Sequence, residues 1–116
     1  LSHSLGGVNP RLHHGTLNAM FLPAVVRFNA QAESVQKEKR LERMAHAMGL
    51  ASSTDIPEAI RDMNARLGLP TGLAAMGVTP DVFDDVIKGA MADHCHKTNP
   101  RVATPEQYRE MLHQSL

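Results

Sequence analysis

The segment from residue 13 to residue 29 reads HHGTLNAMFLPAVVRFN, and it decides the predicted fold class. Its large apolar side chains recur every three or four residues, as on one face of an α-helix, and they are Leu17, Met20, Phe21, Ala24, Val25 and Phe28. Pro23 lies inside this stripe, where it removes a backbone donor and can cost about 3 kcal/mol. We therefore expect a helix here with a kink or a break at Pro23.

Two more helices are predicted in the middle of the chain. One ends at Gly49, a residue type that often follows a helix, and it carries Leu41, Met44, Ala45 and Met48. Its start is poorly defined because residues 31–43 are mostly polar. The next helix begins near Asp55, which has capping-box spacing with Glu58, and ends at Gly68. Its buried face is expected to consist of Ile56, Ile60, Met63 and Leu67.

The last third of the chain predicts two helices with the same kind of start. Thr79-Pro80-Asp81 opens a helix whose apolar stripe is Val82, Phe83, Val86, Ile87, Ala90 and Met91. Thr104-Pro105-Glu106-Gln107 opens another, which carries Tyr108, Met111 and Leu112. Residues 69–78 leave room for one helical turn at most, and no segment has the alternating period of a strand. Residues 1–116 are therefore predicted to form a single all-α domain, a bundle of about five helices.

Composition excludes several classes of function. Twelve Lys and Arg against twelve Asp and Glu give a formal charge of zero, which argues against a nucleic-acid partner. The longest apolar stretch, residues 19–26, is too short to span a membrane. Only 3% of the residues are aromatic, so the core must rely on aliphatic and Met side chains, which favour helices. Cys95 is the single cysteine, and we therefore expect a reducing, cytoplasmic compartment.

Seven histidines are the main candidates for chemistry. His13 and His14 precede Gly15 at the start of the first predicted helix, where the helix dipole disfavours the charged imidazole. Neutral imidazole is the form that binds metal, although these residues by themselves favour the simpler interpretation of two histidines on a solvated loop.

The segment His94-Cys95-His96 resembles a soft-metal cluster, but its spacing argues against one. On a helix, residues two apart point about 200° apart and cannot bind one ion. We interpret the segment as a helix end with cationic side chains near its carbonyls, and we expect His46 and His113 to face solvent or cap a neighbour. The carboxylates are scattered and show no pair placed for acid–base catalysis. The residues alone thus predict a helical domain with one candidate metal ligand.

A longer pattern starts at His14 and continues Gly15-Thr16-Leu17-Asn18-Ala19 as far as Pro23. It resembles the His-Gly-x-x-Asn-Ala-x-x-x-Pro segment of the iron-containing (group III) alcohol dehydrogenase family. The segment His3-Ser4-Leu5-Gly6-Gly7 resembles the family's His-x-Leu-Gly-small step. Three later segments look like the closing third of the same proteins, namely Met76-Gly77-Val78-Thr79, Asn99-Pro100-Arg101 and Thr104-x-x-Gln107. The resemblance is loosest between residues 30 and 75.

The resemblance implies that the nucleotide and the metal are bound by two different domains. In this family an N-terminal α/β part binds NAD or NADP, and a C-terminal helical part, of the dehydroquinate synthase-like fold, holds iron or zinc through one Asp and three His. The last of these ligands corresponds to His14, and the others would precede Leu1. The chain begins without Met, and we expect its nucleotide-binding domain to be missing. His3 matches a histidine near the metal and nicotinamide, which implies a role in relaying the substrate proton.

Two departures from the family pattern affect the ligand assignment. The segment from Gly7 to His14 is one residue longer than usual, and Leu12-His13 replaces a proline, so His13 competes with His14 for the ligand role. We prefer His14 because the Gly-x-x-Asn-Ala pattern counts from it. Gly15 favours the general alcohol dehydrogenase branch over the sister maleylacetate reductases, which usually have an acid or another residue there.

Two functions from different classes follow. The first is the C-terminal part of an NAD(P)-linked alcohol dehydrogenase or aldehyde reductase that acts on an alcohol or aldehyde and forms a homo-oligomer, such as a dimer. Taken alone, the chain is then expected to be inactive and without cofactor, because it brings one of four ligands and no nucleotide fold. The alternative is a non-catalytic helical interaction or scaffold module, in which exposed apolar surface is covered by self-association.

Overall fold

The computed structural model describes all residues, 1–116, and its regular secondary structure is entirely helical. This confirms the predicted all-α class. Short 3₁₀ turns lie at residues 53–55, 74–76, 80–82 and 94–98. The seven α-helices are α1 (Ser2–Val8), α2 (His14–Asn29), α3 (Glu33–Lys37), α4 (Arg40–Ala47), α5 (Ile56–Arg66), α6 (Phe83–Ala92) and α7 (Pro105–Gln114). None of them is both long and apolar enough to cross a membrane.

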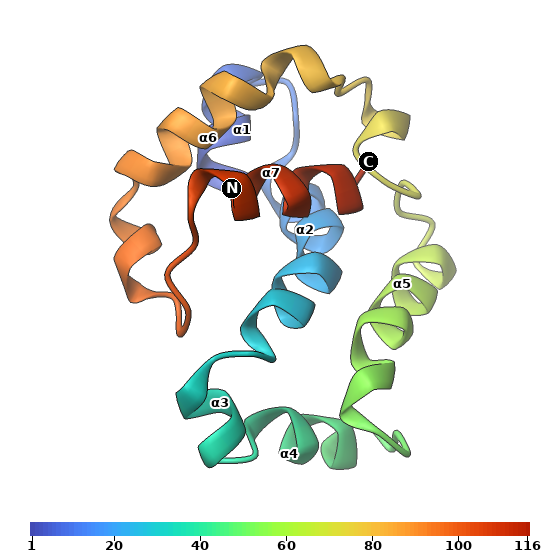
Figure 1. Cartoon of the computed structure of the whole chain (residues 1–116). Coiled ribbons are helices and arrows are strands. Elements are labelled where there is room, and N and C mark those ends of the chain that lie inside the picture. Colours follow the sequence, from blue (N-terminus) through green and yellow to red (C-terminus); the bar gives the residue numbers. More distant parts are fainter.

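Helix α2 is the central element, and the other helices form two groups around it (Figure 1). Helices α1, α6 and α7 form the first group, around the N-terminal half of α2. Helix α5 runs beside α2, and α3 and α4 connect the C-terminal end of α2 to the start of α5. The larger core lies in the first group and contains Leu5, Leu17, Phe21, Phe83 and Leu112. A smaller core of Val26, Ala45, Ile56 and Ile60 holds α4 and α5 against the end of α2.

Helix α1 is not among the helices predicted from the sequence, and it contains two residues of low helix propensity, Gly6 and Gly7. It is held by tertiary contacts: Leu5 is buried, and the Ser4 hydroxyl donates a hydrogen bond of 2.6 Å to the carbonyl of Val86 on α6. Gly89 allows this approach, since a Cβ there would overlap the Ser4 hydroxyl and lie 3.1 Å from Ser4 Cβ. Packing on α6 therefore outweighs the low helix propensity of Gly6 and Gly7.

The helix boundaries match the predicted signals in some places and not in others. Gly49 and Gly68 follow α4 and α5 with positive φ angles of 72° and 71°, as expected for residues that end a helix. The capping box at Thr104 and Gln107 is present. The capping box predicted at Asp55 is wrong, because Ser52 accepts from the Thr54 N–H instead. Thr79 does not cap the next helix either, because its hydroxyl bonds to Asp81.

Pro23 does not break α2, which continues as one helix from His14 to Asn29. A proline at this position removes the N–H that would donate to the carbonyl of Ala19, four residues earlier. The side-chain amide of Asn64, on α5, donates to that same carbonyl at 3.0 Å. A side chain from a neighbouring helix thus replaces the missing backbone hydrogen bond.

This contact also explains an error in the predicted buried face of α5. Ile56 and Ile60 are buried as expected, but Met63 is 42% and Leu67 is 67% exposed. Asn64 is buried in their place, with 7% of its surface exposed. A polar residue occupies this position because its amide has a specific acceptor on α2. On α6, Met91 is likewise 36% exposed, whereas the rest of the predicted stripe is buried or half-buried.

We predict that Asn64→Ala lowers the free energy of unfolding by about 1 kcal/mol, because it leaves the half-buried Ala19 carbonyl without a donor. The cost should be smaller in a Pro23→Ala background, where residue 23 regains an N–H for the same carbonyl. Urea unfolding of the four proteins in this double-mutant cycle measures the coupling. Equal costs of Asn64→Ala in both backgrounds would contradict the proposed replacement.

Candidate functional site

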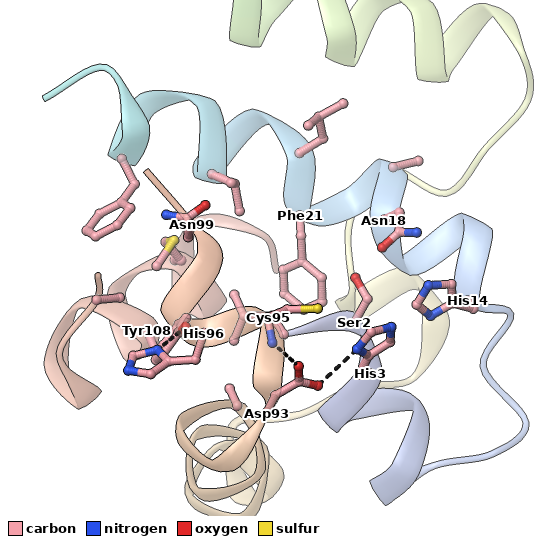
Figure 2. A pocket seen from close by; sticks show the side chains of 18 residues that line it. Ser2, His3, His14, Asn18, Phe21, Asp93, Cys95, His96, Asn99 and Tyr108 are labelled. Carbon is pink, nitrogen blue, oxygen red and sulfur yellow. Dashed lines mark hydrogen bonds and ion pairs between the residues drawn. The ribbon is translucent and has the colours of Figure 1, made fainter. Parts of the chain in front are cut away.

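A cavity of about 520 Å³ lies between α1, α2, α7 and the segment that follows α6 (Figure 2). Most of its wall is apolar, with Phe21, Val25, Phe28 and Met111 among the lining residues. The polar side chains are grouped: His3 and His14 lie toward one end, while His96 and Tyr108 lie toward the other. An apolar cavity with a few convergent polar groups is the usual form of a small-molecule site.

The structure brings the two predicted site residues together. His3 extends from α1 and His14 from the first turn of α2, and their rings are stacked with centroids 5.1 Å apart and an interplanar angle of 16°. Both residues line the cavity, whereas His13 does not. The His14 imidazole is exposed and, unlike those of His3 and His96, is not tied to a hydrogen-bond partner. Its position leaves a ring nitrogen available to a ligand in the cavity.

Asp93 is a third polar residue of the site, and sequence reasoning missed it. Its carboxylate lies 2.9 Å from Nδ1 of His3, although the two residues are 90 positions apart in the chain. The same carboxylate accepts from the backbone N–H of Cys95 at 2.7 Å, as the N-cap of the short helix 94–98. This N–H and the hydrogen bond with His3 lower the pKa of Asp93 from 3.8 to about 2. Asp93 is therefore an anion throughout the physiological range.

The Asp93 carboxylate determines which nitrogen of His3 carries the proton. An ionised carboxylate only accepts hydrogen bonds, so neutral His3 must donate its Nδ1–H to it. The lone pair of a neutral imidazole then lies on Nε2. His3 is thus prepared to accept a proton at Nε2, and a carboxylate stabilises the imidazolium that results.

The segment 94–96 is not a helix end, contrary to the prediction, because α6 ends at Ala92 and a separate 3₁₀ helix starts at His94. As the spacing predicted, His94 and His96 diverge: His94 is exposed, whereas His96 is buried with Nδ1 2.8 Å from the Tyr108 hydroxyl. Burial raises the pKa of Tyr108. Desolvation and the neighbouring Asp93 raise the pKa of the Cys95 thiol. His46 and His113 are exposed, and His113 makes an edge contact with Phe83.

The Asn99-Pro100-Arg101 segment fastens the far side of the cavity to the end of α2. The Asn99 amide donates to the Asn29 side chain at 2.7 Å and to the Arg101 carbonyl at 2.6 Å. The Arg101 guanidinium lies 4.1 Å from the centre of the Phe28 ring and donates to the Phe28 carbonyl at 3.1 Å. These contacts hold two lining residues, Asn99 and Phe28, in place.

The ion pair at Asp93 predicts a dependence of stability on pH. Because its folded-state pKa of about 2 lies below the ordinary 3.8, the stabilisation is complete above pH ~4 and disappears as the pH falls through about 2. As the pH falls from about 5 to about 2, the free energy of unfolding of the wild type should therefore decrease relative to that of Asp93→Asn. Urea unfolding at several pH values in this range measures the difference. Glu42→Gln, an equal charge change on exposed α4, is the control. A constant difference between wild type and Asp93→Asn would contradict the pairing.

His14 by itself fits a metal site only in part. Its exposed imidazole, which has no hydrogen-bond partner, is a ligand type that suits a divalent transition metal, but such a metal is normally held by at least three protein ligands. The fold and cavity thus define a helical domain with one candidate metal ligand, His14, at the edge of a mostly apolar cavity.

The chain belongs to the Fe-containing alcohol dehydrogenase family: residues 1–116 match the family's C-terminal part. It is 56% identical over 120 residues to 4-hydroxybutyrate dehydrogenase of Cupriavidus necator and 31% identical over 124 residues to NAD-dependent methanol dehydrogenase of Bacillus methanolicus. Each alignment covers 100% of this chain but only 31% of the relative. The resemblance inferred from His14 and its neighbours is therefore confirmed.

The crystal structure of a 1,3-propanediol oxidoreductase has the same fold. It matches 99% of this chain and 31% of its own length, with a TM-score of 0.78 and 29% sequence identity. The chain thus spans 31% of the length of these relatives. The fold is that of the C-terminal part of an iron-type alcohol dehydrogenase, as predicted.

Proposed function

We propose that this chain is the C-terminal helical domain of a metal-dependent, NAD(P)-linked alcohol dehydrogenase or aldehyde reductase. The observation that carries the proposal is the stacked pair of His3 and His14 at a mostly apolar cavity, with Asp93 bonded to His3. An N-terminal nucleotide-binding domain and the other metal ligands would come from residues outside this chain.

The proposed substrate is a small alcohol or its aldehyde. The relatives are named for 4-hydroxybutyrate and methanol, and the first shares 56% of its residues with this chain over the aligned region. We therefore place 4-hydroxybutyrate first among the candidates. The apolar wall at Phe21 and Val25 suits the methylene groups of such a molecule.

In this proposal His14, rather than His13, is the metal ligand, because His14 lines the cavity and its imidazole is free. A divalent metal bound there supplies Lewis-acid polarisation of the alcohol or aldehyde oxygen. His3 takes the proton that leaves the alcohol at its Nε2, either directly or through a water molecule, and Asp93 stabilises the resulting imidazolium from Nδ1. For aldehyde reduction, His3 returns the proton. The single, exposed thiol of Cys95 supports a reducing, cytoplasmic location, and we propose a homo-oligomer such as a dimer.

The experiment compares the complete protein with residues 1–116 alone in NAD(P)-linked oxidation of 4-hydroxybutyrate, methanol and 1,3-propanediol. The complete protein should turn over at least one of these alcohols, and the isolated chain should give no turnover, since His14 is one of four required ligands. Turnover by the isolated chain would contradict the proposal. Absence of turnover by the complete protein, combined with self-association of the isolated chain in sedimentation, would favour the scaffold module.

A further inference from the structure

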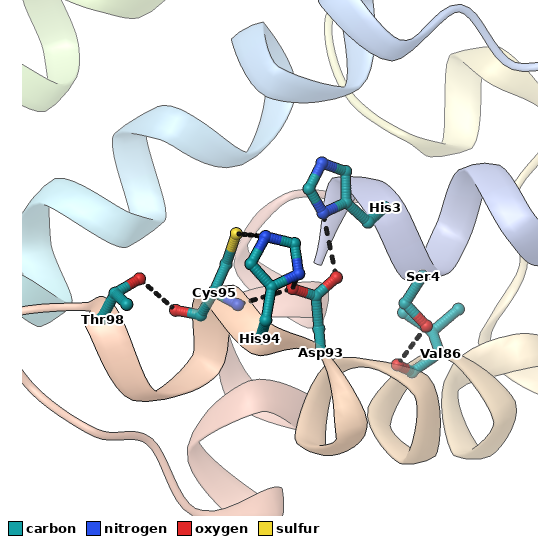
Figure 3. A network of polar contacts seen from close by, with 7 residues as sticks. All are labelled: His3, Ser4, Val86, Asp93, His94, Cys95 and Thr98. Carbon is teal, nitrogen blue, oxygen red and sulfur yellow. Dashed lines mark hydrogen bonds and ion pairs between the residues drawn. The ribbon is translucent and has the colours of Figure 1, made fainter.

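Three potential metal-ligating side chains, His3, Asp93 and Cys95, converge at one place, and His94 lies next to two of them (Figure 3). A ring nitrogen of His3, a carboxylate oxygen of Asp93 and Sγ of Cys95 all lie within 4.8 Å of one another, and Nδ1 is the His3 nitrogen that lies 2.9 Å from the Asp93 carboxylate. His94 is adjacent, with Nδ1 3.5 Å from the Asp93 carboxylate and Nε2 3.4 Å from Cys95 Sγ, and a turn of its ring brings one of these nitrogens to the group as a fourth donor. Folding thus places one carboxylate, one thiol and two imidazoles together, and the proposed proton transfer by His3 uses neither the thiol nor His94.

This set of donors is selective for one chemical class of ion. Nitrogen, oxygen and sulfur ligands in a group of four are typical of Zn²⁺ and related thiophilic cations, whereas Mg²⁺ and Ca²⁺ require oxygen ligands. Around a tetrahedral ion with bonds of about 2.0–2.3 Å, the ligand atoms are about 3.3–3.8 Å apart. Since the three atoms are already within 4.8 Å, the side chains need to move by only about 1 Å.

Hydrogen bonds hold the backbone that carries these side chains, while the two imidazoles are exposed to solvent. Asp93 caps the short helix 94–98 through the Cys95 N–H, and the Thr98 hydroxyl donates to the Cys95 carbonyl at 3.1 Å. Helix α1, which carries His3, is attached to α6 by the bond from Ser4 to Val86. His3 and His94 have 52% and 85% of their side-chain surface exposed. A cation from solvent can therefore reach the donors and draw them together without refolding.

We infer that His3, Asp93 and Cys95, with His94, form a binding site for a thiophilic divalent cation such as Zn²⁺, separate from the metal that we assign to His14. The two sites share no ligand. On binding, the Cys95 thiol proton passes to solvent and a sulfur–metal bond forms. The Asp93–His3 hydrogen bond is replaced by bonds from both residues to the cation.

Filling this site changes the protonation of His3, a consequence that rests on the proposed function. A neutral imidazole that binds a cation through Nδ1 carries its proton on Nε2. Nε2 then has no lone pair for the substrate proton, so the cation switches off the proton acceptor without touching His14. The site is therefore inhibitory, and its occupancy follows the free concentration of the cation.

The test uses the complete protein with its resident metal in place, titrated with Co²⁺. We expect one further equivalent of Co²⁺ to bind and to produce a thiolate-to-cobalt charge-transfer absorption, which a site built from Asp and His ligands cannot give. Cys95→Ser should abolish the band and weaken binding by at least about tenfold, and Asp93→Asn should weaken it as well. His46→Ala, at an exposed histidine on α4, is the matched control and should leave binding unchanged. A band that persists in Cys95→Ser, or no band in wild type, overturns the site.

A second measurement needs no variant. Zn²⁺ should protect Cys95 of the wild-type protein from alkylation by iodoacetamide, with the modified peptide identified by mass spectrometry. Unchanged alkylation at saturating Zn²⁺ overturns the site. The activity readout is separate: added Zn²⁺ should inhibit wild type more than Cys95→Ser, each relative to its own rate without Zn²⁺. Binding without inhibition would reject the role of His3 while leaving the cation site standing.

Discussion

Replacement of His14 by alanine in the complete protein is expected to lower bound metal and turnover together, each by about 100-fold or more. His14 is the one ligand of the resident metal that we propose in this chain, and its loss removes a bond to the metal and a stacking contact with His3 at an exposed position. The helices should remain folded, since substitutions at exposed positions rarely change stability by more than about 0.5 kcal/mol. Metal analysis, steady-state kinetics and circular dichroism on the same preparation measure the three effects.

The matched control for this experiment is His13→Ala. His13 is adjacent in the chain and is also exposed, but it does not line the cavity. Its replacement should therefore leave metal content and turnover near wild type. Full metal content and full activity in His14→Ala would show that His14 is not a ligand. A larger loss of metal in His13→Ala than in His14→Ala would assign the ligand role to His13.

The second large effect is expected from His3→Ala, which should lower turnover by about 10²–10⁴-fold while the metal stays bound. The variant loses the proton acceptor at Nε2 but none of the ligands assigned to the resident metal. The rate should also become less sensitive to pH, because the group that accepts the proton is gone. Metal content and a pH–rate profile in wild type and variant separate this role from that of His14.

Asp93→Asn serves as the comparison for His3→Ala. An amide at residue 93 keeps a hydrogen-bonding partner near Nδ1 but cannot stabilise the imidazolium as a carboxylate does. Its turnover should therefore fall less than that of His3→Ala, with metal retained. Metal loss in His3→Ala as large as in His14→Ala would contradict the separate roles of the two histidines.

The fold class could be predicted from sequence because the apolar period and the glycine stops are local signals. The central helix and the ends at Gly49 and Gly68 follow directly from them. The errors have a common cause, which is tertiary contact. Helix α1 depends on packing against Gly89, and the buried face of α5 depends on an acceptor located on α2. Neither Gly89 nor the Ala19 carbonyl can be identified as a contact from the residues of α1 or α5 alone.

The candidate site was predicted in part for the same reason. His14 stands in a contiguous motif, and so does His3, so both could be proposed from the chain alone. Asp93 could not, because no spacing rule connects it to a histidine 90 residues away, although its position before a short helix is typical of an N-cap. The sequence alone did not distinguish His96 from its exposed neighbour His94, because the burial of His96 depends on its contact with Tyr108 in the folded chain.

The bond from Asn64 to the Ala19 carbonyl also constrains the order in which the two helices acquired their present residues. A carbonyl oxygen has two lone pairs, so an ancestor with an ordinary residue at position 23 could accept the Asn64 amide in addition to its own backbone donor. Proline at position 23 without Asn64 would instead leave the half-buried Ala19 carbonyl without a hydrogen-bond donor. The history most easily tolerated has asparagine first and proline second, after which Asn64 cannot be replaced before Pro23 without leaving the Ala19 carbonyl unbonded.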